Sequence, residues 1–481
     1  MLKKYLKKNK SWLILVLILA LGLVVRLKDF NILPIDAHPM RQTDTECVAY
    51  FIATGKANFL NPKACLMRPV SNSEGYFFLE MPFYELVIAG SYKIFGFQPF
   101  AARLVNLVLY LLGGMALFGF MKGWWNKRMA LFSVLIFSFI PGSIFFVGHA
   151  IHPDAMAVSF ILVSLFFGWK YREKGKLFDL ILAGLFLGIS VASRPFGLIC
   201  LPMLGYFLYL RKSKIKDYLI ILFLSIGFYG FWWWRTRNLG IDMGWENWVL
   251  VGREKLFHLA TLKNLIWKNV IGETMGKVVS VLAGLGLIVG LTKIRKNKDI
   301  VPLILWIGGV VVYWLIVPNG NVTHQYYADV YIPLSVILAA IGLDWIWSKS
   351  KILAILILPI LIYNGIRTSN YHFGDHVGGD IEIKIAQDIE KAIPKDKKII
   401  YLANNDSIPL SLSHRQGWML GEWPTDIAVH IWAFMEMRNY GFDFIVEPKG
   451  KMDVNTEEWD IIKLNYPFVE ELETIRVYKY R

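Results

Sequence analysis

The dominant pattern along the chain is a series of apolar stretches separated by short polar connections. A helix that crosses a bilayer needs roughly 20 mostly apolar residues. By this criterion, the pattern predicts about eleven spans, at 11–29, 101–121, 129–148, 154–169, 177–193, 195–210, 217–234, 276–292, 300–317, 326–347 and 351–366. The predicted fold is mainly α-helical, a polytopic membrane bundle that occupies residues 1–369.

The connections between these stretches alternate in charge. Lys and Arg cluster in 3–10, 122–128, 170–176, 211–216, 293–298 and 349–351, whereas 148–154 and 318–324 contain neither residue. Basic connections remain on the cytoplasmic side of a plasma membrane. The alternation therefore predicts a cytoplasmic N-terminus and an extracytoplasmic C-terminus. A basic start without a small-residue cleavage site before Asp29 predicts an uncleaved signal anchor.

Two long outside segments, 30–100 and 235–275, interrupt the predicted spans. The second opens with WWWRTRN and contains further tryptophans at 245, 248 and 267, which is typical of an interfacial aromatic belt. The tail, 370–481, is more charged. Its pattern predicts helices at 381–393 and 427–441 and strands at 397–403 and 442–448. The tail is therefore predicted to be a small extracytoplasmic α/β domain.

Composition and charge agree with a membrane protein. Hydrophobic residues make up 55% of the chain, above the roughly 45–50% of soluble domains. The net charge of +15 is spread over short clusters rather than a contiguous basic domain, which argues against a nucleic-acid partner. Cys200 lies in an apolar stretch and is expected to be inert. Cys47 and Cys65 share one outside loop, where a disulfide and two free thiols both remain open.

The first outside loop holds the densest polar cluster. Within residues 33–46 it contains Asp36, His38, Arg41, Gln42, Asp44 and Glu46. A carboxylate at a membrane surface can deprotonate an incoming hydroxyl, and a neighbouring arginine can hold a phosphate oxygen. Asp36 and Asp44 are the candidate bases, with Asp36 slightly favoured because it directly follows the first predicted span. The alternative is a solvated turn around two prolines.

Other candidate residues lie at predicted outside ends of the spans. Glu80 precedes Pro82 in an apolar context, where it is predicted to bind substrate or start a helix. His149, His152 and Asp154 share one mouth, where substrate contact, a divalent metal site and a helix N-cap at Asp154 are alternatives.

Cationic and aromatic residues form a further candidate set at outside ends. Arg41, Arg194 and His324 all lie near predicted outside ends, where the folded bundle is predicted to bring them around one phosphate. Tyr326 and Tyr327 are predicted to contact the phosphate and sugar, although tyrosines are also common at membrane interfaces.

The ordered segments resemble GT-C glycosyltransferases, in the protein-mannosyltransferase-like branch that includes the aminoarabinose transferase of lipid A. The resemblance covers nearly the whole chain, most weakly the tail. Its motifs are HPMRQTDT in the first loop, Glu80–Tyr84, KIFGFQPFAARL, HPDAMAVSF, His324–Tyr327 and Arg415–Trp418. Two features depart from the pattern. The acids of the first loop are spread out instead of forming an adjacent Asp-Glu pair, and Glu80-Met81 replaces a lysine common in this fold.

The resemblance implies transfer of one sugar from a polyprenyl-phosphate donor to a hydroxyl of a protein, lipid or glycan. The reaction would occur on the outer face of the plasma membrane with inversion and without a nucleotide. A lipid or polysaccharide flippase is one alternative, which predicts polar mid-membrane surfaces and repeat symmetry, and neither is seen. A non-catalytic scaffold for envelope assembly is another, which would tolerate loss of Asp36 and Asp44.

Overall fold

A computed structural model of the protein describes residues 2–67, 72, 74–240, 250–293, 300–374, 379–403, 406–420, 439–450 and 463–481. The chain divides into two compact units. The membrane unit comprises the described parts of Met1–Phe30, Arg103–Asn238 and Gly244–Phe373. The loop–tail unit comprises those of Asn31–Ala102, Leu239–Met243 and Gly374–Arg481.

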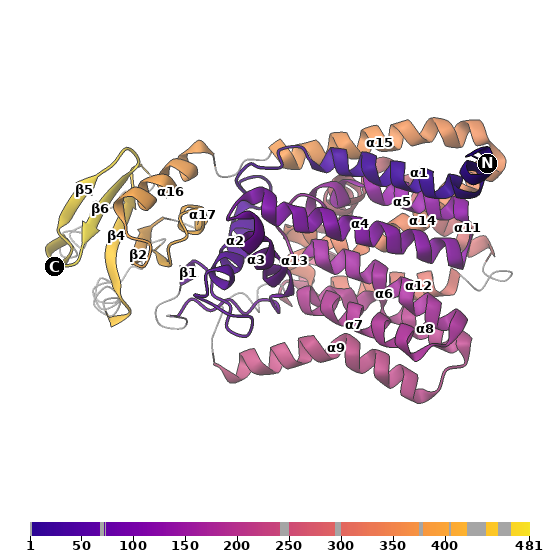
Figure 1. The fold of residues 1–481 in the computed structure, drawn as a ribbon, viewed down its shortest axis with the longest axis horizontal. Coiled ribbons are helices and arrows are strands. Elements are labelled where there is room, and N and C mark those ends of the chain that lie inside the picture. The colour runs from indigo at the N-terminus through magenta and orange to yellow at the C-terminus, as the bar shows by residue number, and fades with distance from the viewer. Residues whose placement is uncertain are drawn as a thin grey trace. The chain divides into compact units, whose positions relative to one another are not determined.

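The membrane unit is a bundle of long helices that run side by side (Figure 1). Its α-helices are α1 (Leu2–Arg26), α4 (Pro99–Trp124), α5 (Lys127–Phe139), α6 (Asp154–Lys174), α7 (Leu177–Ser193), α8 (Leu201–Arg211), α9 (Ile215–Asn238), α10 (Leu259–Asn264), α11 (Lys277–Lys293), α12 (Val301–Ile316), α13 (Pro318–Thr323), α14 (Ile332–Lys349) and α15 (Lys351–Gly374). Shorter or irregular turns are η1 (Ser143–Val147), η2 (Pro195–Cys200), η4 (Arg253–Phe257), η5 (Leu265–Met275) and η7 (Gln325–Tyr331).

Each predicted span coincides with a helical segment of this unit. Five helices of the described chain are individually long and apolar enough to cross a membrane: Pro99–Trp124, Asp154–Lys174, Ile215–Asn238, Gln325–Lys349 and Lys351–Phe373. A pair bent by 107°, Leu259–Met275 with Lys277–Thr292, forms a sixth if it is one span. The multi-pass helical character is confirmed, while the count of about eleven spans remains a prediction.

Glycines allow two helices of the bundle to approach closely. A Cβ added to Gly286 of α11 would lie 1.8 Å from the carbonyl oxygen of Leu338, and one added to Gly342 of α14 would lie 2.1 Å from that of Leu282. The two backbones are therefore in direct contact. Small residues at helix interfaces permit this packing inside a membrane, where a hydrophobic driving force between helices is lacking.

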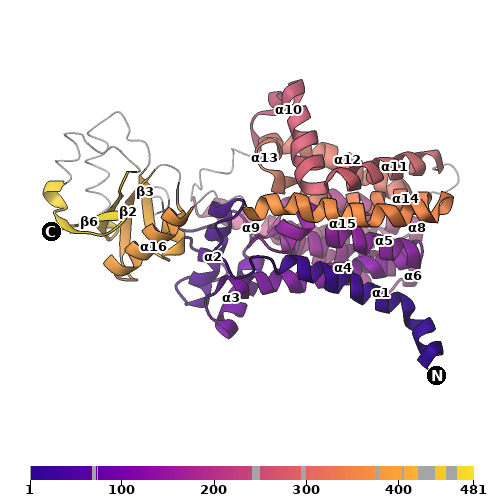
Figure 2. The same ribbon diagram turned by 90° about the horizontal axis from the view of Figure 1, so that it is seen from above.

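The second predicted outside segment is described from residue 250 onward. It contains η4, α10 and η5, and Figure 2 shows α10 standing away from the long helices. Trp267 is 63% exposed, and Trp233 and Trp234 at the end of α9 are also exposed. The interfacial aromatic belt itself remains a prediction. Trp245 and Trp248, by contrast, lie outside the described residues.

The loop–tail unit is built on a six-stranded sheet. Its strands are β1 (Leu66–Met67), β2 (Lys398–Leu402), β3 (Gly417–Leu420), β4 (Phe442–Pro448), β5 (Phe468–Glu471) and β6 (Ile475–Lys479), in the order β1-β3-β2-β4-β6-β5. The first four in that order are parallel, and β6 and β5 continue the sheet antiparallel. Its helices are α2 (Pro39–Ala53), α3 (Phe83–Phe95), α16 (Asp380–Ala392) and α17 (Ile408–Leu412).

The tail elements lie close to their predicted positions. The predicted helix at 381–393 corresponds to α16, and the strands at 397–403 and 442–448 correspond to β2 and β4. The predicted helix at 427–441 lies almost entirely outside the described residues. Helix α16 and strands β2 and β4 therefore alternate along the tail, while a separate small α/β domain at the C-terminus remains a prediction.

The first loop packs with the tail, which differs from the predicted division into 1–369 and 370–481. Strand β1 of the loop pairs with β3 of the tail, with Leu66 opposite Gly417. Phe51 of α2 belongs to the same buried cluster as Ile389 of α16 and Tyr401 of β2. The loop contributes apolar side chains and one strand to this core, so the two segments bury apolar surface together.

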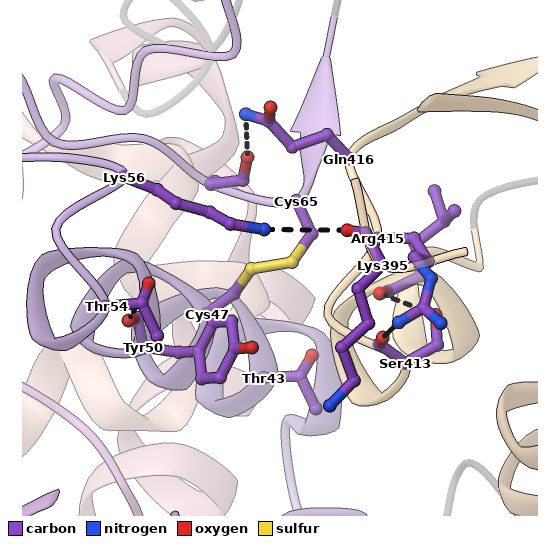
Figure 3. The surroundings of a disulfide bond; sticks show 12 residues. Thr43, Cys47, Tyr50, Thr54, Lys56, Cys65, Lys395, Ser413, Arg415 and Gln416 are labelled. Carbon is purple, nitrogen blue, oxygen red and sulfur yellow. Dashed lines mark hydrogen bonds between the residues drawn. A yellow bond between two sulfur atoms is a disulfide. The ribbon is translucent and has the colours of Figure 1, made fainter. Parts of the chain in front are cut away.

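A disulfide bond joins Cys47 of α2 to Cys65, just before β1, and this decides between the two alternatives left open by the sequence (Figure 3). Both cysteines are buried in the shared core. Tyr50 and Arg415 lie around the bond in Figure 3. The cross-link ties the first helix of the loop to the edge of the sheet. Cys200, in the membrane unit, is buried and unbonded, as expected.

Replacing both Cys47 and Cys65 with serine is expected to destabilise the protein by about 3 kcal/mol, since closing a loop of this length restricts the unfolded chain. The thermal midpoint of the detergent-purified protein, with and without reductant, measures the effect. A Cys200→Ser variant controls for loss of a buried thiol and should retain its response to reductant. An unchanged midpoint of the wild type under reductant would contradict a stabilising disulfide.

Candidate functional site

Asp36, the favoured base of the first loop, lies in a buried turn immediately before α2. Its side chain is fully buried, and the Gln42 amide donates a hydrogen bond of 2.5 Å to its Oδ1 atom. The same amide donates to the Ala37 carbonyl at 2.9 Å, which fixes the Gln42 side chain. Gln42 is thus placed to orient the carboxylate.

His38 holds the turn in an uncommon conformation. Its φ of 58° and ψ of 52° are in the left-handed region, which few non-glycine residues adopt. Pro39 follows at the first position of α2, and the His38 carbonyl accepts the Gln42 backbone N–H at 3.2 Å. Strain of this kind is retained where surrounding structure enforces it, often at functional sites. It is consistent with a functional Asp36–His38 turn.

Arg41 and Glu80, both predicted substrate-binding residues, form an ion pair within the loop–tail unit. Glu80 is 6% exposed, and the Arg41 guanidinium also lies 5.6 Å from the centre of the Phe77 ring. The pair accounts for the presence of a carboxylate in the apolar surroundings of Pro82. It also means that the charge of Arg41 is already balanced by Glu80.

Asp44, the second candidate base, lies on α2 beside Arg41 and Ser411 of α17. Burial raises the pKa of its carboxyl from 3.8 to about 6, while the Arg41 charge acts in the opposite direction. Glu46, further along the helix, accepts a hydrogen bond of 2.9 Å from Tyr92 on α3. Both acids therefore lie where α2 packs against neighbouring helices.

The raised pKa of Asp44 predicts a pH-dependent stability. The folded protein binds this proton more tightly than the unfolded chain, so the associated stability is present below about pH 4 and is lost as the pH rises through about 6. Relative to wild type, Asp44→Asn should gain stability over this interval, by about 3 kcal/mol. Thermal midpoints between these pH values measure it, with the exposed Asp396→Asn as control. A difference independent of pH would contradict the shift.

Arg194 is the centre of a buried cluster in the membrane unit. It follows α7, and its Nε and Nη2 atoms donate to Asp154 Oδ1 and Oδ2 at 3.0 and 3.1 Å. His152 also pairs with Asp154, and its ring nitrogens lie 3.2 and 3.3 Å from Arg194 Nη2. The third nitrogen, Nη1, forms no hydrogen bond with the described residues. The Arg194 guanidinium is thus held in place, and its Nη1 group remains available as a hydrogen-bond donor.

Aromatic residues surround this cluster. The Arg194 guanidinium lies 5.5 Å from the centre of the Tyr326 ring. The centre of the His152 ring lies 4.6 Å from the centre of the same tyrosine ring. Tyr327 stacks on Tyr326 with the ring centres 5.0 Å apart, and the ring centres of His324 and Tyr326 are 5.2 Å apart. The predicted residues of the membrane unit therefore meet around one tyrosine. The candidates of the first loop belong to the loop–tail unit.

Sequence reasoning missed a buried carboxylate near the Arg194 cluster. Asp329 on η7 is fully buried, and neither of its oxygens has a hydrogen-bond partner within the described chain. It lies against Gly142, where an added Cβ would be 2.9 Å from its Oδ1 atom. A lone acid at the apolar start of the predicted 326–347 span was the available signal. Arg26, fully buried in α1, is a second charge within a predicted span.

The side chains of His149, His152 and Asp154 are not arranged as ligands of one metal ion. His149 packs against Phe373, with ring centres 4.5 Å apart, whereas His152 faces Asp154 and Arg194. Among the described residues, no three His, Cys, Asp or Glu side chains are grouped to hold a metal ion.

Arg415, the first residue of the Arg415–Trp418 motif, has a structural role in the loop–tail unit. Arg415 is buried and donates to the carbonyl oxygens of Ser413 at 2.6 Å and Ile393 at 2.7 Å. It thereby ties the end of α17 to the end of α16, as the hydrogen bond to Ser413 in Figure 3 illustrates.

Comparison with protein families matches residues 80–234 to the dolichyl-phosphate-mannose-protein mannosyltransferases. A comparison with curated protein sequences finds no match. The structure is similar to that of ArnT from Cupriavidus metallidurans bound to undecaprenyl phosphate. The TM-score is 0.64 at 14% sequence identity, covering 96% of this chain and 97% of ArnT.

The oligosaccharyltransferase of Archaeoglobus fulgidus is also similar. Its complex with Zn and sulfate gives a TM-score of 0.60 at 12% identity, covering 96% of this chain and 73% of that protein. The structure of the same protein tethered to an acceptor peptide that contains the NVT sequon gives a TM-score of 0.60 at 11% identity. This match covers 99% of this chain and 75% of the oligosaccharyltransferase. These comparisons confirm the resemblance read from the motifs. The chain therefore has the GT-C glycosyltransferase fold and is similar to the protein mannosyltransferases and ArnT.

Proposed function

We propose that the protein transfers a single sugar from a polyprenyl-phosphate donor to an acceptor hydroxyl on the outer face of the plasma membrane. The observation that carries this proposal is the buried Arg194, which Asp154 holds in place while Nη1 remains available. Such a cation suits a phosphate oxygen, because guanidinium groups bind phosphate through directed N–H bonds. The similar ArnT structure is of a protein bound to undecaprenyl phosphate, which supports the same class of donor here.

In the proposed reaction, Asp36 accepts the proton of the acceptor hydroxyl while the oxygen of that hydroxyl attacks the anomeric carbon of the sugar. The bond between that carbon and the phosphate oxygen breaks, and the polyprenyl phosphate leaves with the electron pair. Arg194 stabilises the negative charge that develops on the leaving phosphate. A single displacement of this kind inverts the anomeric centre.

The test uses the purified full-length protein in vesicles with a panel of polyprenyl-phosphate sugars and hydroxyl acceptors. The expected result is release of polyprenyl phosphate together with a sugar-modified acceptor. A comparison of glycolipids and glycoproteins between a deletion strain and its parent identifies the natural acceptor. Absence of transfer from every donor, with both strains carrying identical glycans, would refute the proposal.

A further inference from the structure

The connection between α6 and α7 and the connection between α8 and α9 lie at one end of the helical bundle (Figure 1). Their side chains line a polar pocket of about 330 Å³. One wall comes from the first connection, through Tyr171 and Gly175. The other wall carries four cationic side chains within six residues, those of Arg211, Lys212, Lys214 and Lys216. Two basic connections, separate in the sequence, thus meet in one concave site.

Arg211 gives this site a defined wall. Its Nη1 atom donates to the Arg172 carbonyl at 3.0 Å, and its guanidinium lies 5.3 Å from the centre of the Tyr171 ring. A Cβ added to Gly175 would lie 1.7 Å from the Arg211 Nη2 atom, so glycine at this position lets the guanidinium pack directly against the α6–α7 connection. These contacts join the α6–α7 connection to the α8–α9 connection.

The pocket has more hydrogen-bond donors than acceptors. The side chains of Lys212, Lys214 and Lys216 form no ion pair or hydrogen bond within the described part of the chain. Asp217 is the single acid of the lining, and its Oδ2 atom accepts the Lys214 backbone N–H at 3.1 Å. The buried Ser213 hydroxyl lies beside Tyr171, on the opposite wall of the pocket. An anion with several oxygens would satisfy these donors.

Lys212 occupies a backbone conformation that favours glycine. It ends α8 with φ 57° and ψ 43°, and its N–H bonds to the carbonyls of Leu208 and Tyr209. Helices that end in this way usually place glycine at this position, because a Cβ is strained there. The presence of lysine at this strained position adds a cation to the pocket.

Apolar side chains beside the pocket indicate the source of the anion. Leu177 lines it and is 54% exposed; the neighbouring Phe178 is 67% exposed, and Ile215, between two of the lysines, is 75% exposed. A free phosphate ion would leave these side chains in water, whereas the acyl chains of a lipid would cover them. Basic pockets between membrane helices are suited to anionic lipid head groups.

We propose that this pocket binds the head-group phosphate of an anionic phospholipid, with its acyl chains against Leu177, Phe178 and Ile215. The site is separate from the Arg194 cluster and does not depend on the proposed reaction. By the charge alternation of the connections, the lipid belongs to the cytoplasmic leaflet.

The test is native mass spectrometry of the full-length protein titrated with phosphatidylglycerol or phosphatidylcholine. Wild type should bind phosphatidylglycerol more tightly. Because each surface cation contributes about fivefold, Lys212→Gln with Lys214→Gln should weaken this binding about 25-fold. The matched control, Lys122→Gln with Lys127→Gln, removes two cations from another basic connection and should leave binding nearly unchanged.

Lys212→Gly separates binding from folding. It relieves the left-handed strain, so its thermal midpoint should be at least that of wild type while phosphatidylglycerol binding falls about fivefold. Three results would overturn the proposal. They are equal binding of the two lipids, wild-type affinity in the Lys212 and Lys214 variants, and displacement of phosphatidylglycerol by millimolar inorganic phosphate, which would indicate a site for the free ion.

Discussion

Asp36→Asn is expected to lower the rate of sugar transfer by about 10²–10⁴-fold, the usual contribution of a general base. The amide has the same shape and its oxygen can still accept the hydrogen bond from Gln42, so the buried turn should fold normally. Donor binding should also persist, because the substitution removes only the proton acceptor. The measurement is turnover of a polyprenyl-phosphate sugar by the purified variant, with donor affinity determined separately.

Asp44→Asn is the comparison variant for this experiment. Asp44 lies on α2 next to Ser411, where it packs against α17, and we expect its replacement to lower turnover much less. Gln42→Met tests the positioning role, with a smaller loss of turnover than Asp36→Asn and unchanged donor affinity. Near-normal turnover in both aspartate variants would reject the base assignment, and a loss confined to Asp44→Asn would transfer the role to that residue.

Arg194→Met is expected to destabilise the protein by about 3–5 kcal/mol, because it leaves the buried Asp154 without its cation. Asp154 is only 2% exposed, so water cannot replace the lost interaction effectively. Sugar transfer should be lost as well, since the proposed phosphate-binding group is gone. The thermal midpoint and the transfer rate of the same preparation measure the two effects.

A double variant distinguishes structural from functional loss. Arg194→Met with Asp154→Asn removes both charges and should recover much of the stability without recovering transfer. The Arg128–Asp344 ion pair at the surface of the same unit is the control. Arg128→Met should lower the free energy of unfolding by less than about 1 kcal/mol. Wild-type transfer by the double variant would show that Arg194 has no part in the reaction.

The helical bundle was largely predictable because its signals lie along the chain itself. Apolar length marks a segment that favours lipid, and flanking charge orients it, so neither requires knowledge of distant residues. The predicted 177–193 span matches α7 residue for residue. Interruptions were less visible: the predicted 129–148 span is divided into α5 and η1 by a break at residues 140–142.

The candidate site was predictable as residue types but not as partners. The sequence pointed to Arg41 and Glu80 separately, and only the folded loop–tail unit shows that they neutralise each other. Likewise, the sequence places Arg194 only at the end of the predicted 177–193 span, yet in the fold it contacts both Asp154 and His152. A salt bridge between residues 40 apart depends on how α6 and η2 pack, and no local pattern encodes that packing.

By itself, the sequence determined the membrane character of this protein, the positions of its helices and the resemblance to GT-C enzymes. These follow from hydrophobicity and charge, which act through the solvent on each segment separately. Only the tertiary structure decided that the first loop and the tail form one unit, with Leu66 paired to Gly417 and Cys47 bonded to Cys65. Such contacts arise because both segments need a common core to bury their apolar faces, and that need becomes visible only when the chain is folded.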